Sequence, residues 1–326
     1  MTYAADTGSA NTYVASYVPK LPTLIDGMRL TFKAKTANTG ASTFAPNGNT
    51  AYPLYSHANQ ALQGGEIIAN GLIEVEWNST LTAWVLCGNS GGALPVAAAT
   101  QSNHAMPLGQ ATGRLLNVQY FTSNGTYTPT AGTTSVVVEL IGGGGAGGGI
   151  PLAAGAGTAG GGGGGGGYGR KRITSGFSGV TVTIGSGGTG VINNTGGSGT
   201  TSSFGSLITA LGGTGGGAGS TTTSTAIPVG AQGVGGLTTL ADVTRKGGGG
   251  GTGLISSTFA QGGVGGDTML APQTQSSSTI ITSVIAGNPA AANSGAGGAS
   301  AVGLNSGTTA SGGNGGSGIC IVWEYS

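Results

Sequence analysis

Five basic residues in the glycine-rich half of the chain have side chains that could bind an anionic ligand. They are Arg170, Lys171, Arg172, Arg245 and Lys246, and they make up five of the seven charged residues between positions 142 and 318. Guanidinium and ammonium groups form charge-assisted hydrogen bonds with phosphate and carboxylate oxygens. The set is therefore a candidate contact for an anionic glycan. The alternative, which we favour, is a solvated face without a ligand.

Ser90 lies in a pattern that some hydrolases use for a nucleophile. Residues 88–92 read Gly-Asn-Ser-Gly-Gly, which fits G-x-S-x-G and follows a strand-like run. That nucleophile elbow requires a helix directly after the turn, but Ala-Leu-Pro-Val follows here. Cleavage of a glycosidic bond would need a pair of carboxylates, and the nine acidic residues lie mostly outside the glycine-rich half. We expect no enzymatic activity and no cofactor.

The histidines and cysteines predict neither a metal centre nor a disulfide. His57 and His104 have no Cys or His partner at metal-ligand spacing. A metal on a symmetry axis, which needs one histidine from each chain, is the alternative. Cys87 and Cys320 each lie in an apolar, strand-like run, so we expect buried free thiols. A phosphate-binding P-loop is excluded, because the sequence contains no Gly-Lys dipeptide.

The composition indicates an ordered β protein that binds no nucleic acid and does not insert into a membrane. Only 6% of the 326 residues are charged, and the formal net charge is +1, whereas an ordinary soluble domain has about 25% charged residues. Disordered chains combine high net charge with few β-branched residues, but Thr, Val and Ile are abundant here. A nucleic-acid-binding protein would carry a strongly basic face. No apolar run approaches the ~20 residues that span a membrane.

The distribution of glycine divides the chain. Residues 142–318 hold 59 of the 73 glycines, and the residues before them read as ordinary β protein. Residues 29–35 alternate apolar and polar side chains like a half-buried strand, and residues 72–87 read as a β-hairpin. Residues 96–116 are Ala-rich and read as a short helix or an extended connector. The predicted domains are a β-rich module over 1–95, a connector over 96–121 and a glycine-rich domain over 122–326.

Packed extended helices explain the glycine runs better than a linker or collagen does. The strand-like segments 134–141 and 318–326 bound the region and are expected to pair with each other. A flexible linker would not be expected between two paired strands. Collagen needs glycine strictly at every third residue, and the runs break that rule. Polyproline-II backbones of glycine, by contrast, can approach closely enough to bond to neighbours on every side. The runs lie at 142–149, 160–167, 212–219, 233–236, 247–251, 262–266 and 312–318.

Ordering so many glycines requires a bundle rather than single strands. Each ordered glycine costs about 0.5–1 kcal/mol more than an alanine, so the 59 glycines cost on the order of 30–60 kcal/mol. Only dense hydrogen bonds between neighbouring polyglycine-II helices can offset this cost. We therefore interpret the glycines as a scaffold.

The alternation of runs predicts which loops meet at each end of the bundle. With the bounding strands at a base, the loops 150–159, 220–232, 252–261 and 299–311 meet at the opposite tip. The strand-like segments 180–185, 204–212 and 278–287 are expected at the base. Apolar groups gathered on a rigid tip predict an interaction surface, and the alternative is that they pack on one another to cap the bundle. The candidate receptor-binding residues are Ile150, Leu152, Ile227, Pro228, Leu254, Ile255, Phe259, Leu304 and Asn305.

An ordered series of motifs resembles a known family. "TSNGTYTPTAGTTSVVVELIGGGGAGGG", "GGGGGGGYGRKRI", "GVTVTIGSGGTG", "LGGTGGG" and "GGSGICIVWEY" are similar to the glycine-rich C-terminal region of bacteriophage and prophage tail fibre proteins of Mu-like and P2-like phages. A related glycine-helix bundle forms the tip adhesin of some T-even phages. The resemblance covers residues 122–326, and residues 1–115 look like shaft modules of such fibres. From the abrupt start of the sequence we expect a C-terminal piece of something longer.

The resemblance implies an all-β fibrous fold, with β shaft modules followed by strands and packed polyglycine-II helices. It implies a homotrimer at the distal end of a tail fibre on the virion, and an assembly chaperone is a further expected partner. Its function would be that of an adhesin that binds lipopolysaccharide or an outer-membrane protein of the host bacterium. Arg170-Lys171-Arg172 departs from the small or acidic stretch common in the family, which leaves the receptor type open. A purely structural fibre segment is the main alternative, and a glycan-cleaving fibre is a third.

Overall fold

The protein is all-β and forms two compact units, Met1–Thr112 and Gly113–Ser326. The computed structural model describes residues 3–94, 96, 98–101, 105–152, 154–223, 227–256, 258–280, 282–305 and 307–326. Among these residues there are several β-sheets, no α-helix, and one short 3₁₀ helix, η1 (Leu108–Gln110). The predicted connector, 96–121, is divided between the two units. Each unit is described below by itself.

The first unit is built on one seven-stranded sheet. Its strands are β1 (Tyr3–Ala5), β2 (Thr12–Ala15), β3 (Arg29–Lys33), β4 (Ser42–Pro46), β5 (Tyr52–Tyr55), β6 (Leu72–Asn78) and β7 (Ala83–Asn89), in the order β1-β3-β6-β7-β5-β4-β2. The antiparallel pairing of β6 with β7 confirms the predicted hairpin. The strand expected at 29–35 is β3, which buries Leu30 and Phe32 on one face as the alternation predicts.

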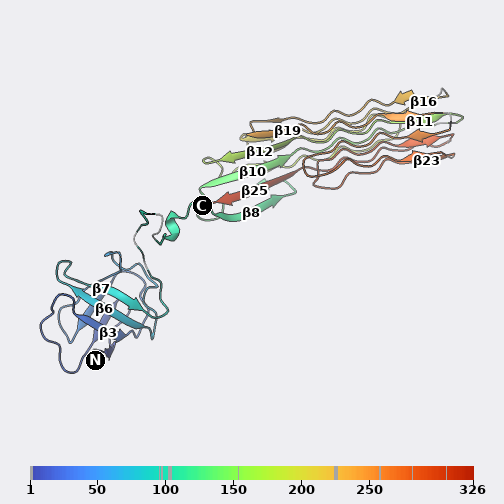
Figure 1. Cartoon of the computed structure of the whole chain (residues 1–326). Helices are drawn as coiled ribbons and strands as arrows, with labels where there is room; N and C mark the ends of the chain where they lie inside the picture. The colour runs from blue at the N-terminus through green and yellow to red at the C-terminus, as the bar shows by residue number, and fades with distance from the viewer. Residues whose placement is uncertain are drawn as a thin grey trace. The chain divides into compact units, whose positions relative to one another are not determined.

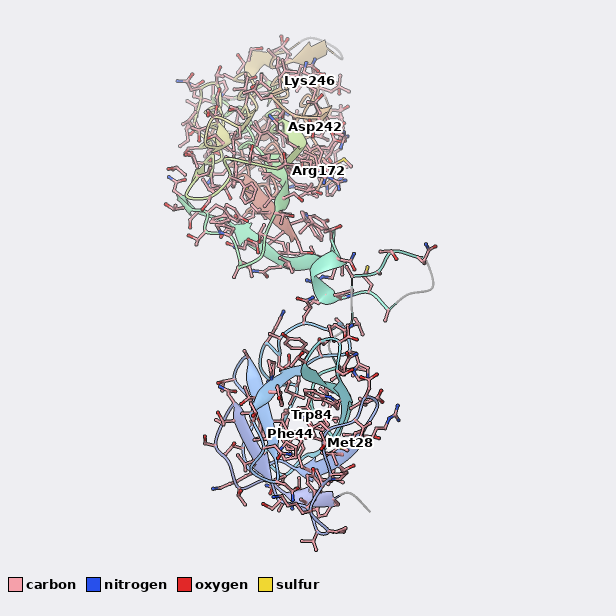
Figure 2. All side chains as sticks on the ribbon, turned by 90° about the vertical axis from the view of Figure 1, so that its left-hand side faces the viewer. Met28, Phe44, Trp84, Arg172, Asp242 and Lys246 are labelled. Atoms are coloured by element: carbon pink, nitrogen blue, oxygen red, sulfur yellow. The ribbon has the colours of Figure 1, made fainter. Side chains whose placement is uncertain are left out.

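Stacked aromatic rings fill the core of the first unit. Phe32 stacks on Phe44 with ring centroids 4.6 Å apart, and Phe44 meets Trp84 edge-on at 5.4 Å. Figure 2 labels Phe44 and Trp84 inside this sheet. All three side chains are fully buried, and aromatic pairs of this kind contribute about 0.5–1.5 kcal/mol beyond the area they bury. The unit therefore has a hydrophobic core of its own.

At one end of the second unit, which we call the base, two five-stranded sheets pack face to face. One consists of β8 (Leu115–Phe121), β10 (Ser135–Ile141), β12 (Tyr168–Ile173), β19 (Val243–Arg245) and β25 (Ile319–Tyr325), in the order β19-β12-β10-β25-β8. The other consists of β9 (Gly125–Thr126), β13 (Thr181–Thr183), β14 (Ser202–Phe204), β15 (Ile208–Ala210) and β18 (Thr238–Thr239), in the order β18-β15-β14-β13-β9. Val138, Phe204 and Val322 lie in the core between them. The antiparallel pair β10–β25 confirms that the bounding strands of the glycine region fasten together.

The opposite end of the second unit, which we call the tip, holds two four-stranded sheets. One has β11 (Gly157–Ala159), β16 (Ser220–Thr222), β23 (Ser283–Ile285) and β24 (Val302–Leu304), in the order β16-β11-β24-β23. The other has β17 (Ile227–Val229), β20 (Gly253–Ile255), β21 (Ala260–Gln261) and β22 (Ser278–Thr279), in the order β17-β20-β21-β22. Figure 1 shows long segments without strands running side by side between β10 and β25 at the base and β11 and β23 at the tip.

The glycine runs bond to their neighbours with a period of three residues. Along residues 142–149, every third N–H donates to the same neighbouring run: Gly142, Gly145 and Gly148 donate to the carbonyls of Gly167, Gly164 and Gly161 over 2.8–3.0 Å. The N–H groups between them donate to runs 194–200 and 310–316, and carbonyls of 143–149 accept from Gly188, from 213–219 and from 298–301. Six segments therefore surround this run, three as acceptors and three as donors.

Residues 160–167 form a second central run of the same kind. Their N–H groups donate to 211–217, 248–251 and 295–301, and their carbonyls accept from 142–148, 233–236 and 263–266. The two runs with the most glycines, seven of eight residues in 142–149 and all eight in 160–167, are thus those enclosed on every side. The reason is steric, because a Cβ built on Gly164 would collide with the carbonyl oxygen of Val234.

One segment was predicted at the wrong end. Residues 278–287 were expected at the base, but β22 pairs with β21 and β23 pairs with β24, both at the tip. The cause is run 271–277, which contains no glycine and was therefore not recognised as crossing the unit. This run bonds to 262–268 through three backbone hydrogen bonds with the same period of three, and its side chains are exposed or half-buried. At the surface, side chains can point away from the bonded neighbour.

Candidate binding surfaces

Part of the predicted receptor-binding set forms the interior of the tip. Ile255 and Leu304 are 0% and 3% exposed and pack with Ala159, Val229 and Val302 where the two four-stranded sheets meet. Ile150 is also 0% exposed and packs with Ala301 and Ala310. This corrects the expectation that these three residues lie on the surface. They cap the bundle instead, because Ile255 and Leu304 pack between the two tip sheets and Ile150 packs against Ala301 and Ala310.

Other members of the set lie on the surface of the tip. Leu152 is 55% exposed and Leu254 is 40% exposed, Asn305 is exposed, and Phe259 is half-buried. Leu254 faces outward because its strand neighbours Gly253 and Ile255 are buried. Ile227 and Pro228 belong to β17, whose backbone pairs with β20, and their side chains lie outside the described part of the chain.

The misplaced segment adds two exposed apolar residues to the tip. Ile280 is 73% exposed directly after β22, and Ile285 is 37% exposed at the end of β23. The sequence shows that both residues are apolar. It predicts them at the base, however, because run 271–277 before them contains no glycine and does not look like a run that crosses the unit. The tip segments 150–159, 220–232, 253–261, 278–286 and 299–311 contain no charged residue. A ligand at the tip would therefore be held by apolar contact and by hydrogen bonds from hydroxyl, amide and backbone groups.

The basic residues lie together at the base, on β12 and the neighbouring β19 and at Lys246 directly after it. Three of them are engaged: Arg170 Nε lies 3.8 Å from Glu139 Oε1, Lys171 Nζ donates to the carbonyl of Leu207 over 2.9 Å, and Arg245 Nη2 pairs with Asp267 Oδ2 at 2.6 Å. Such pairing holds these cations against the sheet rather than presenting them to a ligand.

The side chains of Arg172 and Lys246 differ from the other three in their contacts. Both residues are exposed, and within the described chain neither side chain makes an ion pair or hydrogen bond. Figure 2 labels them with Asp242, whose Oδ2 accepts the backbone N–H of Arg172 over 2.8 Å. The basic cluster thus lies at the end of the second unit opposite Leu254 and Ile280. The two candidate surfaces are separate.

The other sequence candidates have structural roles or lie outside the described residues. Ser90 is followed by irregular chain over the described residues 91–94, and its Oγ accepts the backbone N–H of Leu72 over 2.8 Å. His57 is exposed, His104 lies outside the described residues, and in the described residues no three His, Cys, Asp or Glu side chains could jointly hold a metal. Cys87 and Cys320 are free thiols, but only Cys320 is buried as expected, while Cys87 is half-buried. Burial raises the pKa of Cys320 to about 12.

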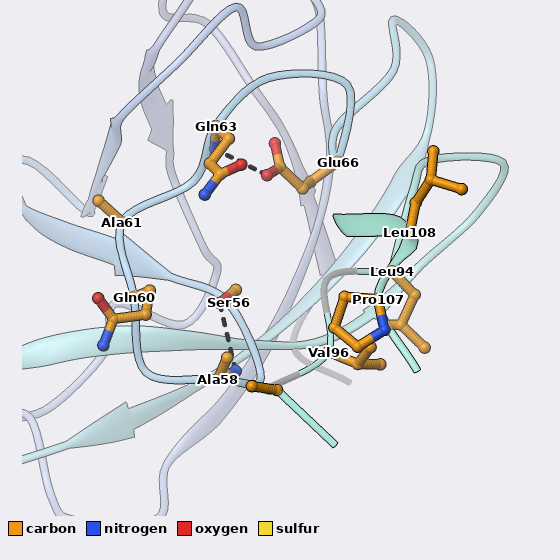
Figure 3. A pocket seen from close by; sticks show the side chains of 11 residues that line it. Ser56, Ala58, Gln60, Ala61, Gln63, Glu66, Leu94, Val96, Pro107 and Leu108 are labelled. Atoms are coloured by element: carbon orange, nitrogen blue, oxygen red, sulfur yellow. Dashed lines mark hydrogen bonds between the residues drawn. The ribbon is translucent and has the colours of Figure 1, made fainter. Parts of the chain in front are cut away.

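A cavity of about 440 Å³ lies in the first unit, between the Ser56–Glu66 loop and residues Leu94, Pro107 and Leu108 (Figure 3). The Glu66 carboxylate at its edge accepts N–H groups of Gln63, Gly64 and Asn38, each at 2.7 Å. Burial favours a raised pKa for Glu66, but these hydrogen bonds outweigh burial and lower it. The carboxylate thus organises its loop and is not poised as a general acid.

No helix in the described residues is long and apolar enough to cross a membrane.

Comparison with known proteins identifies the family of the glycine-rich half. A search of curated proteins finds no match. Residues 120–325 match the model of a family described as a glycine-rich domain. Because the match covers well over half of the chain, this protein belongs to that glycine-rich domain family.

Proposed function

We propose that the glycine runs of the second unit are polyglycine-II helices packed as a rigid scaffold. The support is the three-residue period of their hydrogen bonds, since the polyproline-II conformation has three residues per turn. Six bonded neighbours around each central run are what threefold helices of glycine would have in a close-packed bundle. The scaffold holds its two ends at a fixed separation without using side chains.

We propose further that this unit is the distal, receptor-binding tip of a bacteriophage tail fibre. The observation that carries the proposal is the gathering of exposed, uncharged loops at one end of the bundle, because binding residues commonly sit on loops held by a rigid scaffold. The contact residues we propose are Leu152, Leu254, Phe259, Asn305 and Ile280. The fibre would be a homotrimer on the virion, assembled with a chaperone, and it would act as an adhesin and not as an enzyme.

The receptor would be lipopolysaccharide or an outer-membrane protein of the host bacterium. Because the proposed contact residues are uncharged, recognition would depend on shape and hydrogen bonding and would change little with salt. Arg172 and Lys246 at the base would contribute only if a long anionic glycan lay along the bundle. The alternative is a purely structural segment, in which the tip sheets merely cap the scaffold.

Binding to susceptible cells tests this function. Labelled full-length protein, with its oligomeric state determined by light scattering, is added to host cells and to mutants with truncated lipopolysaccharide. We expect the double variant L254S/I280S to bind about tenfold more weakly, as for a hot spot worth about 1.4 kcal/mol. The matched control is V243S, because Val243 is 56% exposed on β19 at the base.

The outcomes separate the candidates. Loss of binding on truncated strains identifies the glycan as receptor, and retained binding identifies an outer-membrane protein or the inner core. Equal binding of L254S/I280S and V243S would favour the structural alternative. Shortened polysaccharide after incubation would instead indicate a glycan-cleaving fibre.

A further inference from the structure

A second cavity of the first unit combines aromatic rings with hydrogen-bonding side chains. It has a volume of about 570 Å³, within the ~300–1,000 Å³ typical of small-molecule sites. The lining residues that matter here are Lys20, Thr23, Asn49, Thr50, Tyr52 and Trp77. None of them belongs to the tip, to the basic cluster of the base, or to the cavity beside Glu66.

Two aromatic side chains of the lining are held firmly by the core. The rings of Tyr52 and Trp77 lie with centroids 4.7 Å apart at an interplanar angle of 58°. Trp77 also contacts the fully buried Trp84 at 5.3 Å. Trp77 is only 7% exposed, so a small part of its ring reaches the cavity, and the half-buried Tyr52 offers the larger apolar surface.

The polar walls are fixed on both sides of the cavity. The loop that carries Lys20 and Thr23 begins after Tyr17, whose backbone exchanges two hydrogen bonds of 3.0 and 3.1 Å with the side chain of Asn47. It ends at Gly27 and Met28, which exchange backbone hydrogen bonds of 2.9 and 2.8 Å with Trp77. Asn47 lies in the β4–β5 turn that also carries Asn49 and Thr50. The site is thus largely formed before any ligand arrives.

We propose that this cavity binds a saccharide ring, with a preference for one that bears a carboxylate. A pyranose offers an apolar face of C–H groups, which suits Tyr52 and Trp77, and a rim of hydroxyls, which suits amide and hydroxyl partners such as Asn49 and Thr50. Lys20 is the charged residue of the lining, and it would pair with the carboxylate. A nucleic acid would require several cations along its phosphates.

This site is independent of the function proposed for the tip. It lies in the other unit, and its lining includes two aromatic rings and a cation, whereas the exposed tip residues are uncharged and mainly aliphatic. An experiment that finds no binding at one site therefore does not contradict the proposal for the other site.

Titration of the full-length protein with glucuronic acid and glucose, followed by ligand-observed NMR, tests the proposal. We expect both sugars to bind in the millimolar range, with glucuronic acid about threefold tighter because an exposed ion pair contributes up to about 1 kcal/mol. K20Q should abolish that difference and leave glucose binding unchanged. N49A should weaken both sugars about tenfold, equivalent to about 1.4 kcal/mol.

The controls make the outcome decisive. K33Q removes an exposed lysine of β3 outside the cavity and should behave like the parent protein, as should L254S/I280S at the tip. The proposal is overturned if neither sugar binds the folded protein at millimolar concentrations. It is equally overturned if binding survives N49A but is lost in L254S/I280S.

Discussion

Glu324 is a buried carboxylate in the core of the base. It is fully buried on β25 and accepts hydrogen bonds from Tyr127 Oη at 2.6 Å, from Gln119 Nε2 at 2.9 Å, and from the N–H and Oγ1 of Thr130 at 3.2 and 2.5 Å. Burial favours a raised pKa, but the hydrogen bonds outweigh it and hold the pKa of Glu324 below its ordinary value. The ionised side chain therefore fastens β25 to the loop before β10.

This pKa shift predicts how stability depends on pH. A group whose pKa is lower in the folded state stabilises the fold above its unfolded pKa, and that contribution is lost as pH falls through the folded pKa. We expect the second unit to lose stability as the pH falls through about 4.3, where an unfolded glutamate is half protonated. E324Q should cost about 1–3 kcal/mol at pH 7 and flatten the acid dependence.

Urea unfolding followed through Trp323, the neighbour of Glu324 on β25, measures both effects. The matched control is E139Q on β10, because the Glu139 side chain, which is 18% exposed, makes only a long ion pair of 3.8 Å with the half-exposed Arg170. It should cost less than about 1 kcal/mol. An E324Q protein with the stability and pH profile of the parent would contradict this account.

The position of Glu324 also shows what the sequence could not reveal at the residue scale. The terminal strand, Ile-Cys-Ile-Val-Trp-Glu-Tyr, has apolar residues at both its odd and its even positions. The alternation of side chains therefore did not show which face of the strand is buried. A lone glutamate would be placed outside by default, yet Cys320, Val322 and Glu324 face inward. Its donors come from residues 119–130, about two hundred positions away, and no local pattern indicates them.

At the scale of elements, the glycine content of a run reports its place in the bundle. The central runs 142–149 and 160–167 are nearly pure glycine, while run 271–277, at the surface, has none. The existence and direction of the glycine-rich runs were therefore predictable, since enclosed backbones exclude a Cβ. Run 271–277 was not predictable, because a surface run bonded on one side imposes no such restriction.

Alanine substitutions test this difference between runs. G164A places a Cβ against the carbonyl oxygen of Val234 and should cost about 3 kcal/mol or more, as severe overpacking does. G249A is the matched control, since Gly249 is exposed and its nearest contact, Gly233 O, would lie 3.6 Å from the new Cβ. It should be neutral or stabilising by up to about 1 kcal/mol. Equal losses of urea-unfolding stability would show that the enclosed backbone is not what selects glycine.

The tip illustrates the same limit for the candidate site. The sequence placed four loops there correctly, because runs of glycine alternate in direction between β10 and β25. It did not separate Leu254, which is exposed, from its neighbour Ile255, which is buried. That distinction depends on how two sheets made of distant segments face one another, and a three-residue strand is too short for its own pattern to show it.

At the scale of the whole molecule, the second unit depends on its last strand and the first unit does not. β25 pairs with β10 on one side and β8 on the other, as an interior strand of the base sheet. Among the described residues, by contrast, the buried core of the first unit is drawn from positions 4–86. The two units should therefore lose their structure independently.

Deletion of residues 319–326 checks this independence. We expect the second unit to unfold and the first to persist, so that limited proteolysis with mass spectrometry yields a resistant fragment ending near residue 112. Deletion of residues 3–5, which form the edge strand β1, is the control and should leave the second unit resistant. Loss of both units in the first deletion would show that they fold together.

The three-residue bonding period has a consequence for how such a domain can change its length. If one glycine run shifts by three residues along its neighbour, the same pattern of backbone hydrogen bonds forms again. The glycine runs therefore do not determine which residues of neighbouring runs are paired. Register is set by the sheets at the two ends, where side chains such as Val138 and Leu304 differ from their neighbours. Insertions of three residues in each facing run would thus lengthen the rod by about 9 Å per step. The length of this unit can therefore change during evolution in steps of three residues, while the sheets at both ends stay the same.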